Sequence, residues 1–381
     1  MSRGTVLVYR DRIVPRSEAQ FLRRLYVGFD KLEPHWVGCR LDDGVADLGA
    51  TPSILGRPGL LGGLDRMLFK QLGVLPRLPD LAALGPVAVH AHFGRGGALA
   101  LPIARHFDIP LVVTYHGGDA TKDKHYLRRL PPTIYQRRVE RLKREAAAII
   151  CVSDFIRDRL IDRGFPPGKL KIIRYGIEIE ADSTEESIGG EPYVLFVGRF
   201  VEKKGIIHLL DAMRLLRQQG RASPLVVIGE GPLGEALQTE AADLSGIRFL
   251  GWQNQDEVRR WMRGALVLCV PSVVARAGDA EGLPNVVLEA MASGVPVIGS
   301  LSAGIGEAIE QDVTGLLVPP GEPAPLAAAL ARLIDDPGLR RDMGAAARRR
   351  AAEHFSAEGQ SRLLEETLLG LIEARRSRPF C

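Results

Sequence analysis

The chain has 381 residues, of which 46% are hydrophobic and 25% charged, with a formal net charge of +4. This length exceeds one ordinary hydrophobic core and predicts two domains, and the composition is that of a soluble globular protein. The charge is unevenly divided. Residues 1–176 carry 29 Lys and Arg against 17 Asp and Glu, whereas the remainder carries 21 against 29. The amino-terminal half is therefore expected to face an anionic partner.

The cysteines and apolar runs indicate the compartment. Cys39, Cys151, Cys269 and Cys381 are widely separated and form no metal-ligand or C-x-x-C spacing, which is typical of a reducing compartment. No secretory signal is recognised, because the short apolar run Thr5–Tyr9 is followed directly by charged residues. No apolar run approaches the roughly 18–20 residues that cross a bilayer. We predict a cytoplasmic protein, peripheral at the inner face of the plasma membrane.

Short β-rich runs alternate with helical patterns along the first half. Thr5–Tyr9 is the first expected strand, and Ser17 is a candidate N-cap for a helix that carries Phe21 and Leu22. A turn at Gly94–Gly97 is expected to precede a helix at Leu99–His106. The further expected strands are Val87–His92, Leu111–Tyr115, Ala148–Val152 and Leu170–Ile173. This alternation predicts parallel βαβ units.

Residues 178–190 are rich in Glu, Asp, Ser and Thr and are predicted to be a linker, after which the alternation resumes. The expected strands are Tyr193–Val197, Leu225–Ile228, Ile247–Leu250, Leu266–Val270, Pro296–Ile298 and Leu316–Val318, and the expected helices are Lys204–Gln219, Leu233–Ala242, Asp256–Arg263 and Pro325–Ile334. We predict a Rossmann-like domain at 1–176, a linker at 177–190, a second Rossmann-like domain at 191–355 and a helical segment at 356–381. Two doubly wound halves predict a ligand cleft at the carboxyl ends of their strands.

Two glutamates, Glu281 and Glu289, flank a Gly-Leu-Pro-Asn turn. Asn285 is predicted to be the N-cap of a helix over residues 286–292, with Glu281 in the preceding loop and Glu289 about one turn inside. Free backbone N–H groups at a helix start suit an anionic ligand group, and the two carboxylates suit neighbouring hydroxyls. Together these features match a nucleotide sugar. The alternative is that both carboxylates are only solvated charge.

A second stretch with ligand-binding chemistry, Gly198–Gly205, follows the first strand of the second half. Its small residues allow close approach of a ligand, and Arg199 and Lys204 form a candidate diphosphate clamp. Lysines at a helix start oppose the helix dipole and therefore need an anionic partner. The alternative is again solvated charge. Gly229-Glu230-Gly231-Pro232 is a weaker candidate, and the chain has no G-x-G-x-x-G fingerprint after the first strand and no Walker A sequence.

His116-Gly117-Gly118-Asp119 follows a predicted strand of the first half, so these residues are expected at the carboxyl edge of its sheet. Strand alternation places His90 and His92 on one face, where Asp119 or a backbone carbonyl could satisfy either ring. A metal site at the three histidines is not favoured, because no carboxylate set completes it.

The segment Lys122–Arg144 holds nine basic residues against Asp123 and Glu140, interleaved with hydrophobic residues. We predict an anionic membrane surface as its partner, and the alternative is a solvated helix face. Nucleic acid is not expected, because no nucleic-acid-binding motif accompanies the charge.

The order of these motifs resembles that of the retaining glycosyltransferases of sequence family 4. The resemblance covers nearly the whole chain and is carried by Gly198–Gly205, Gly229–Pro232, Pro271–Ser272, Glu281–Glu289, Ala290–Val297 and Gly315–Val318. Ala91–Phe93, Thr114–Ala120 and Gly278–Pro284 are similar to the exopolysaccharide branch, of the colanic-acid and amylovoran type. The resemblance implies an α/β GT-B fold, with the C-terminal helix packed back on the N-terminal domain.

The resemblance also implies roles for individual residues. Arg199 and Lys204 would hold the donor diphosphate, and Glu281 and His116 would act at the reacting sugar. The remaining implied contacts are Gly282, Leu283, Pro284 and Asn285 with the donor sugar and phosphates, Glu289, Gly229 and Glu230 with the ribose and nucleotide, and Asp119, His92 and Gly117 on the acceptor or sugar side. No metal or other cofactor is implied, because the basic pair and the helix dipole neutralise the diphosphate.

The implied reaction is transfer of a hexosyl group, with retention, from a nucleotide diphosphate sugar to a glycan or lipid-linked acceptor. A front-face mechanism would fit the lack of an evident nucleophile. One departure from the family is that Tyr9–Ser17 contains no glycine, although many relatives carry a glycine-rich loop there; Arg16 and Ser17 are candidate replacements. The alternatives are a GT-B nucleotide-sugar epimerase, a pyridoxal-phosphate-dependent phosphorylase and a non-catalytic carbohydrate or membrane-surface binding protein.

Overall fold

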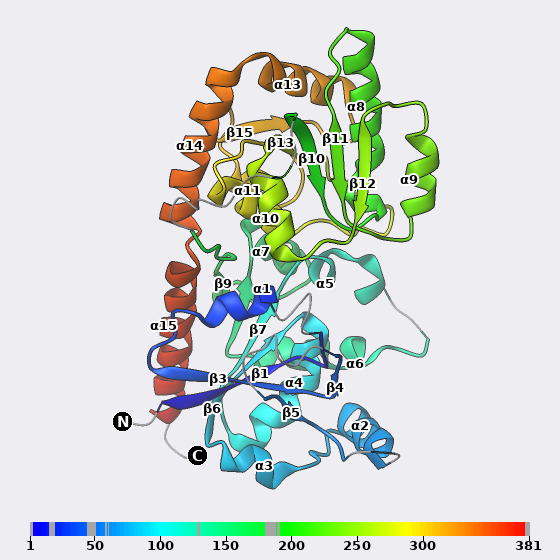
Figure 1. Ribbon diagram of the computed structural model, residues 1–381. Helices are drawn as coiled ribbons and strands as arrows, with labels where there is room; N and C mark the ends of the chain where they lie inside the picture. Colours follow the sequence, from blue (N-terminus) through cyan, green and yellow to red (C-terminus); the bar gives the residue numbers. More distant parts are fainter. Residues whose placement is uncertain are drawn as a thin grey trace. The chain divides into compact units, whose positions relative to one another are not determined.

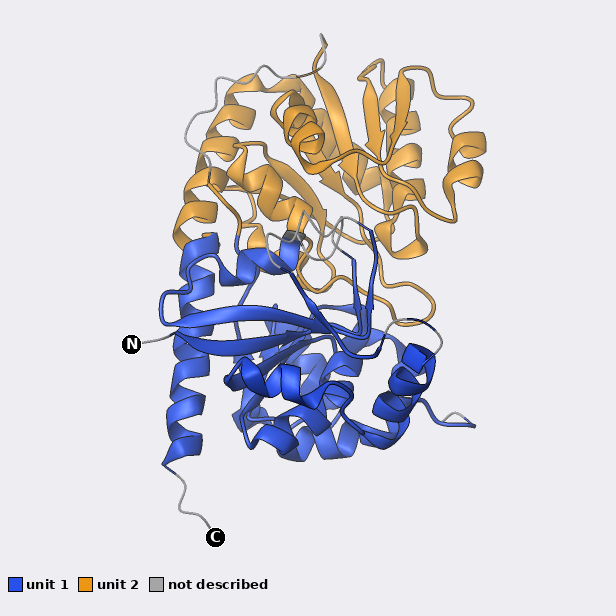
Figure 2. Ribbon diagram, turned by 60° about the horizontal axis from the view of Figure 1, so that its bottom comes forward, with its two compact units in different colours: residues 1–176, 357–381 blue, residues 177–356 orange. Residues whose placement is uncertain are grey.

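The computed structural model describes residues 3–14, 20–43, 51–57, 59, 61–127, 130–179, 188 and 191–377 (Figure 1). The chain divides into two compact units, residues 1–176 together with 357–381, and residues 177–356 (Figure 2). Each unit is built on a parallel sheet with helices packed against it. The predicted pair of Rossmann-like folds is confirmed.

The sheet of the first unit has seven parallel strands in the order β5-β3-β1-β6-β7-β8-β9. Their bounds are β1 Gly4–Tyr9, β3 Leu32–Gly38, β5 Ser53–Ile54, β6 Pro86–His92, β7 Leu111–Tyr115, β8 Ala148–Cys151 and β9 Leu170–Ile172. Two short strands, β2 Arg12–Ile13 and β4 Arg40–Leu41, pair beside it. The central strands are mostly buried because helices cover both faces, and they are apolar apart from His90 and His92 of β6 and Thr114 of β7 among their buried residues. The strand order reverses between β1 and β6, which is where doubly wound sheets bind ligands.

The helices of the first unit are α1 Gln20–Arg23, α2 Leu61–Leu72, α3 Leu78–Ala83, α4 Gly94–Phe107, α5 Gly118–Thr121, α6 Ile134–Glu145, α7 Asp154–Asp162 and α15 Ala357–Arg376. Short 3-10 turns lie at η2 Arg24–Tyr26, η4 Asp123–His125 and η5 Pro167–Lys169. Helix α6 begins at a capping box, in which Thr133 accepts from the backbone N–H of Gln136 and the Gln136 side chain accepts from that of Thr133.

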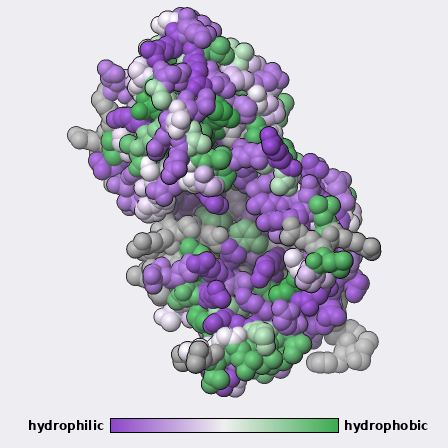
Figure 3. Space-filling model, turned by 90° about the vertical axis from the view of Figure 1, so that its right-hand side faces the viewer, coloured by the Kyte–Doolittle hydropathy of each residue, from purple (hydrophilic) through white to green (hydrophobic). Residues whose placement is uncertain are grey.

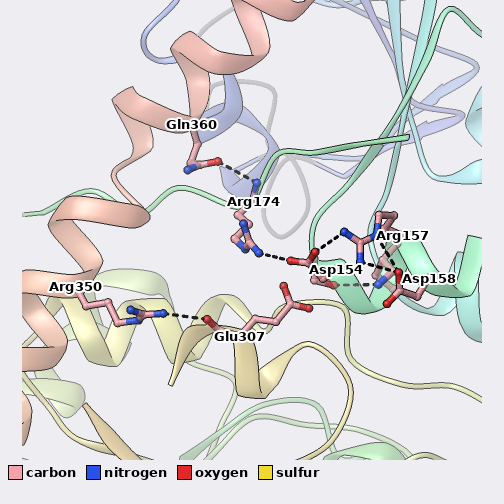
Figure 4. Close-up of polar contacts among 9 residues, drawn as sticks. Asp154, Arg157, Asp158, Arg174, Glu307, Arg350 and Gln360 are labelled. Carbon is pink, nitrogen blue, oxygen red and sulfur yellow. Dashed lines mark hydrogen bonds and ion pairs between the residues drawn. The ribbon is translucent and has the colours of Figure 1, made fainter. Parts of the chain in front are cut away.

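Helix α15 returns to the first unit, as the sequence predicts. The Glu365 carboxylate is buried and accepts hydrogen bonds from the backbone N–H groups of Asp30, Lys31 and Leu32 at 2.8–3.1 Å. Gln360 accepts from the backbone N–H of Arg174, whose guanidinium pairs with Asp154 (Figure 4). Segments at opposite ends of the chain are therefore joined by charged and polar hydrogen bonds.

The sheet of the second unit has six parallel strands in the order β12-β11-β10-β13-β14-β15. Their bounds are β10 Tyr193–Val197, β11 Leu225–Ile228, β12 Ile247–Gly251, β13 Ala265–Val270, β14 Val297–Ser300 and β15 Gly315–Val318. The order reverses between β10 and β13, so the loops after these two strands meet at the carboxyl edge. A core of aliphatic side chains from β10, β11 and helices α8 and α13 supports that edge.

The helices of the second unit are α8 Ile206–Gln218, α9 Gly234–Glu240, α10 Gln255–Arg263, α11 Asn285–Ala292, α12 Ile305–Ala308, α13 Pro323–Asp335 and α14 Pro337–His354, with a 3-10 turn at η6 Glu202–Lys204. The Arg350 guanidinium on α14 donates to the carbonyls of Glu307 and Ala308 at the end of α12 (Figure 4).

Three local expectations are wrong. Gly94–Gly97 is the first turn of α4 and not a loop, because a Cβ at Gly94 would meet the Tyr115 ring at 2.5 Å and glycine lets this helix pack against β7. Asn285 is the first residue of α11, whose N-cap is Pro284. The helix expected from Lys204 is interrupted at Gly205, which has a φ of +64°. Ser17 and Arg16 lie outside the described residues, as does most of the predicted linker.

Candidate active site

The loops after β10 and β13 bring together a charged cluster in the second unit. The Lys204 Nζ atom lies 3.2 Å from Oε1 of Glu281, and Lys203 Nζ lies 3.4 Å from the same oxygen and 3.3 Å from Oδ1 of Asp279. Because Glu281 is 8% exposed, these ion pairs are partly shielded from water. The anionic partner that the two lysines need is therefore supplied, without a ligand, by the Glu281 loop.

The protonation state of Glu281 follows from its surroundings. Burial by itself raises the pKa of a carboxyl group, but Lys204 and Lys203 favour the charged form, and the pKa of Glu281 is lowered overall. Its Oε1 atom makes no hydrogen bond of good geometry despite the two ammonium groups beside it. Glu281 is thus a buried carboxylate held by charge attraction.

Arg199 supplies the positive charge of the cluster that no carboxylate balances. Its side chain is exposed, and none of the described carboxylates lies within ion-pair distance of it. The backbone around it is tightly packed: a Cβ on Gly205 would lie 1.9 Å from the Pro271 carbonyl oxygen, and one on Gly229 would lie 2.0 Å from that of Gly198. Glycine is required at both positions, and it fixes the three loops against one another.

The start of α11 lies directly after Glu281. Gly282, Leu283 and Pro284 are buried, Asn285 is half-buried, and no side chain caps the helix start. The Val287 N–H donates to the Pro284 carbonyl at 3.1 Å, so the helix start offers the N–H groups of Asn285 and Val286. Glu289 is half-buried one turn along the helix, as the sequence predicts.

The loop after β11 has a more structural role than the sequence suggests. The Glu230 Oε1 atom accepts a hydrogen bond from the backbone N–H of Trp252 at 3.2 Å, so it connects this loop to the one after β12. The Trp252 side chain is 58% exposed at that edge. Sequence reasoning missed Trp252; an aromatic residue directly after a predicted strand end was the available signal.

In the first unit, Asp119 organises the loop after β7. Its buried carboxylate accepts from the backbone N–H groups of Gly94, His116 and Gly117 at 2.9–3.0 Å. Burial raises the pKa of Asp119, and these three hydrogen bonds partly oppose the rise. The Asp119 side chain therefore caps the start of α4 from a neighbouring loop. Its carboxylate oxygens are hydrogen-bonded to backbone N–H groups. The expectation that it might satisfy His90 or His92 is wrong.

The three histidines form one hydrogen-bonded chain with partners that the sequence did not reveal. His92 Nδ1 lies 3.1 Å from His116 Nε2, and His92 Nε2 lies 2.7 Å from the Tyr26 hydroxyl. The same hydroxyl lies 2.7 Å from His90 Nδ1, whose ring continues to Thr114 Oγ1 at 2.7 Å.

At the other end of the chain, His116 Nδ1 bonds the Tyr175 hydroxyl. The predicted common face of His90 and His92 is confirmed by their shared Tyr26 partner. Burial lowers the pKa of His90 to about 3 and lowers that of His92 and His116 well below the usual value, with Arg10 adding to the effect on both. All three rings are therefore neutral near pH 7.

The hydrophobic residues of Lys122–Arg144 do not form an exposed face. Ile134, Tyr135 and Leu142 are buried, while Leu127 and Leu130 are 60% and 99% exposed. Several of the basic groups already have protein partners: Arg138 donates to backbone carbonyls at the end of α2, and Lys143 pairs with Glu140. The apolar face of α6 is therefore packed within the unit, and the anionic membrane surface expected as the partner of Lys122–Arg144 stays a prediction.

None of the helices that the structure describes combines the length and apolarity needed to span a bilayer. Within the same residues, no group of three or more His, Cys, Asp or Glu side chains is arranged to hold a metal ion.

Two parallel-sheet units, the second carrying a basic cluster at its topological switch point, define the class as GT-B glycosyltransferases. The crystal structure of Anabaena HepE in complex with UDP and glucose superimposes with a TM-score of 0.76, covering 97% of this chain and all of that one at 19% identity. This likeness shows the fold.

Sequence comparison gives the family. Residues 21–181 match the model of Glycosyltransferase Family 4, and residues 178–350 that of Glycosyl transferases group 1. The amylovoran biosynthesis glycosyltransferase AmsK of Erwinia amylovora is 33% identical over 73% of this chain and 68% of its own length. The putative colanic acid biosynthesis glycosyltransferase WcaL of Salmonella typhimurium is 32% identical over 73% and 69%. The chain therefore belongs to the glycosyltransferases of family 4.

Proposed function

We propose that this glycosyltransferase moves a hexosyl group from a nucleotide diphosphate sugar to a glycan or lipid-linked acceptor hydroxyl, with retention, in exopolysaccharide or cell-surface glycan synthesis. The observation that carries the proposal is the pairing of Lys203 and Lys204 with Glu281 before the uncapped start of α11, with Arg199 on the same loop after β10. An exposed guanidinium, two half-buried ammonium groups and the backbone N–H groups of a helix start match a diphosphate. The names of the relatives AmsK and WcaL support the pathway.

In the proposed mechanism, Arg199 and Lys204 bind the leaving diphosphate and stabilise the charge that it gains as the glycosidic bond breaks. Glu281 shares Lys204 with that diphosphate and accepts from a sugar hydroxyl. Glu289 accepts from the ribose, and the exposed ring of Trp252 offers a flat face to the base. The leaving phosphate takes the acceptor proton, in the front-face pathway.

No metal is required in this proposal, because side-chain cations and the helix start already neutralise the diphosphate. Calorimetry with UDP, GDP, ADP and TDP, each with and without magnesium, tests whether a diphosphate binds and whether its binding needs a metal. We expect metal-independent binding of one diphosphate, weakened in Arg199→Ala and Lys204→Ala. Arg221→Ala, which removes an exposed arginine paired with Asp335, is the matched control. Absence of binding at millimolar concentrations would leave the carbohydrate-binding alternative in place.

Retention is tested separately by proton NMR of the product formed with the donor that calorimetry selects. An anomeric configuration equal to that of the donor sugar supports the proposed chemistry. An inverted product, or a trapped glycosyl-enzyme, would exclude the front-face pathway. Release of free nucleotide and an altered sugar without an acceptor would indicate the epimerase alternative.

We also propose that a lipid surface docks on the first unit through helix α2 and not through the apolar face of α6. Leu61, Leu64, Met67 and Leu72 of α2 are 46–72% exposed. The lower end of the face in Figure 3, where Figure 1 places α2, carries a hydrophobic patch. Arg138 ties the basic helix α6 to the end of α2, so charge lies beside the apolar stripe, as anionic membrane interfaces require.

Flotation with vesicles tests this surface. We expect binding to vesicles of phosphatidylglycerol, weak binding to phosphatidylcholine, and loss of binding in Leu64→Glu. Leu301→Glu, which changes an equally apolar and exposed residue of the second unit, is the control. Equal binding of both variants would exclude α2 as the docking surface.

A further inference from the structure

The hydrogen-bonded chain in the first unit joins six side chains from four parts of the fold. Tyr26 belongs to η2, His90 and His92 to β6, His116 and Thr114 to the end of β7 and its loop, and Tyr175 to the segment after β9. The inner members are buried, with His90 and His92 fully so, whereas His116 is partly exposed at the carboxyl edge of the sheet. The chain therefore runs from the core of the unit to that edge.

Proton counting restricts this chain to two arrangements. A neutral imidazole has one N–H and one acceptor nitrogen, and a phenol has one O–H. Each inner imidazole therefore donates in one of its two links and accepts in the other. A pattern in which Tyr26 accepts from both rings would leave its buried O–H without an acceptor in this chain. When Tyr26 donates to one of its two rings, every donor points the same way. If the chain starts at Tyr175, His116 carries its proton on Nε2. If it starts at Thr114, the proton is on Nδ1.

Aromatic packing sets the orientation of the His116 ring, while the hydrogen-bonded chain determines which ring nitrogen carries the proton. The His116 ring stacks on Tyr175 with an interplanar angle of 11° and lies 4.4 Å, centroid to centroid, from the ring of Phe93. Phe93 itself has a φ of +66°, a strained conformation for a non-glycine residue, and its ring lies 4.2 Å from the Arg10 guanidinium carbon. The orientation of His116 is thus set by aromatic contacts on two sides.

We propose that Tyr26, His92 and His90 are positioning residues for His116, and that they couple its tautomer to those of His92 and His90 through this continuous chain. The role of His116 in transfer rests on the proposed function, whereas its tautomer does not. Both ring nitrogens of His116 are bonded to protein groups, so its tautomer decides which of its two neighbours donates and which accepts. Through the buried chain, that choice depends on the Tyr26 hydroxyl, which does not touch His116.

The test is imidazole nitrogen NMR on the full-length protein labelled with ¹⁵N-histidine, which reports the tautomer of each histidine ring. In the unaltered protein we expect the three histidines to carry the proton on the same ring nitrogen, either Nε2 in all three or Nδ1 in all three. Tyr26→Phe removes the central hydroxyl, and His116 is then expected to show a mixture of tautomers. Tyr135→Phe is the matched control, because it removes another buried hydroxyl, 3.0 Å from Tyr115 Oη and 3.2 Å from Tyr126 Oη, outside the chain. An unchanged His116 tautomer in Tyr26→Phe would overturn the proposal.

Thermal unfolding checks that Tyr26→Phe is folded. If it is not folded, Thr114→Val replaces it in the test, because this variant removes the hydroxyl that bonds His90 at the end of the hydrogen-bonded chain. An unchanged His116 tautomer in Thr114→Val would overturn the proposal in the same way.

The activity measurements separate positioning from general stability. His92→Leu is expected to lower kcat about tenfold with donor KM unchanged, and His92→Gln, whose amide both donates and accepts, is expected to recover most of that loss. Equal losses in both variants would contradict a hydrogen-bonding role. If no donor sugar is turned over by the unaltered protein, the proposed function fails, while the tautomer result still decides the inference.

Discussion

The Lys204 ammonium group lies 3.2 Å from the Glu281 carboxylate, on loops that follow the two strands between which the order of the second sheet reverses. The pair therefore occupies the edge at which doubly wound sheets bind their ligands. A basic side chain already near a buried carboxylate is pre-oriented, so the position of the Lys204 cation is set before any ligand binds.

We expect Lys204→Ala to weaken nucleotide diphosphate binding about tenfold and to lower the transfer rate about a hundredfold, because it removes charge stabilisation of the leaving group. Lys203→Ala should cost less, since Lys203 also pairs with Asp279. Calorimetry and initial rates measure the two effects. Equal losses in both variants would mean that Lys204 has no special role.

Glu281→Gln should change the acid dependence of stability. The pKa of Glu281 is lowered in the folded protein, so its contribution is complete above the unfolded value of about 4.3 and is lost as the pH falls through the folded pKa. Urea unfolding between pH 7 and pH 3 should therefore show a smaller acid loss in Glu281→Gln. Parallel curves for the two proteins would argue that the lysines do not stabilise the charged form.

Gly205→Ala should destabilise the second unit severely, by about 3 kcal/mol or more, because the new Cβ would overlap the Pro271 carbonyl at 1.9 Å. Gly220→Ala is the control, since Gly220 also has a positive φ, +75°, but nothing lies within 4 Å of its Cβ position. That variant should lose only about 1 kcal/mol from backbone strain. Chemical denaturation distinguishes the two costs, and similar values would show that packing at Pro271 is unimportant.

The buried histidines should make the first unit sensitive to mild acid. Because the pKa of His90 is lowered to about 3, the unfolded chain binds a proton below pH about 6.5 that the folded chain does not. Unfolding free energy should therefore fall by up to about 1.4 kcal/mol per pH unit for each such histidine between pH 6.5 and 5. His90→Gln should reduce this slope. A slope unaffected by His90→Gln would show that this ring titrates normally.

Glu365→Gln should destabilise the first unit by about 2 kcal/mol, because a charged acceptor for three backbone N–H groups becomes a neutral amide. Glu366→Gln changes the adjacent, exposed carboxylate and should have almost no effect. Denaturant titration of both variants measures the difference. Equal stability of the two would indicate that α15 is held by its apolar contacts alone.

Most of the parallel strands could be predicted, because their apolar runs are covered on both faces and bounded by polar turns. Strand β3 was missed, since Leu32–Gly38 contains Glu33, Pro34 and His35 and has no continuous apolar pattern. The start of α4 was also missed, because its glycines respond to the packing of Tyr115 and Val113, which no local pattern encodes.

The candidate site was only partly predictable. The Glu281–Glu289 spacing and the basic residues after the first strand of the second half indicated the charged cluster of Lys203, Lys204 and Glu281, because these residues lie in loops that follow strands. Tyr26 and Tyr175 carried no such signal: they reach the histidines from segments distant in sequence. The sequence also could not show that the Asp119 carboxylate accepts hydrogen bonds from three backbone N–H groups.

The contact of Glu365 with residues 30–32 has a consequence for how the protein is made. The backbone N–H groups before β3 leave the ribosome early, but their acceptor is translated only after the whole of the second unit. During synthesis, the first unit must wait for its last helix while the second unit is already complete and free to fold. The unit whose synthesis begins first is therefore the last to have all of its residues available for folding.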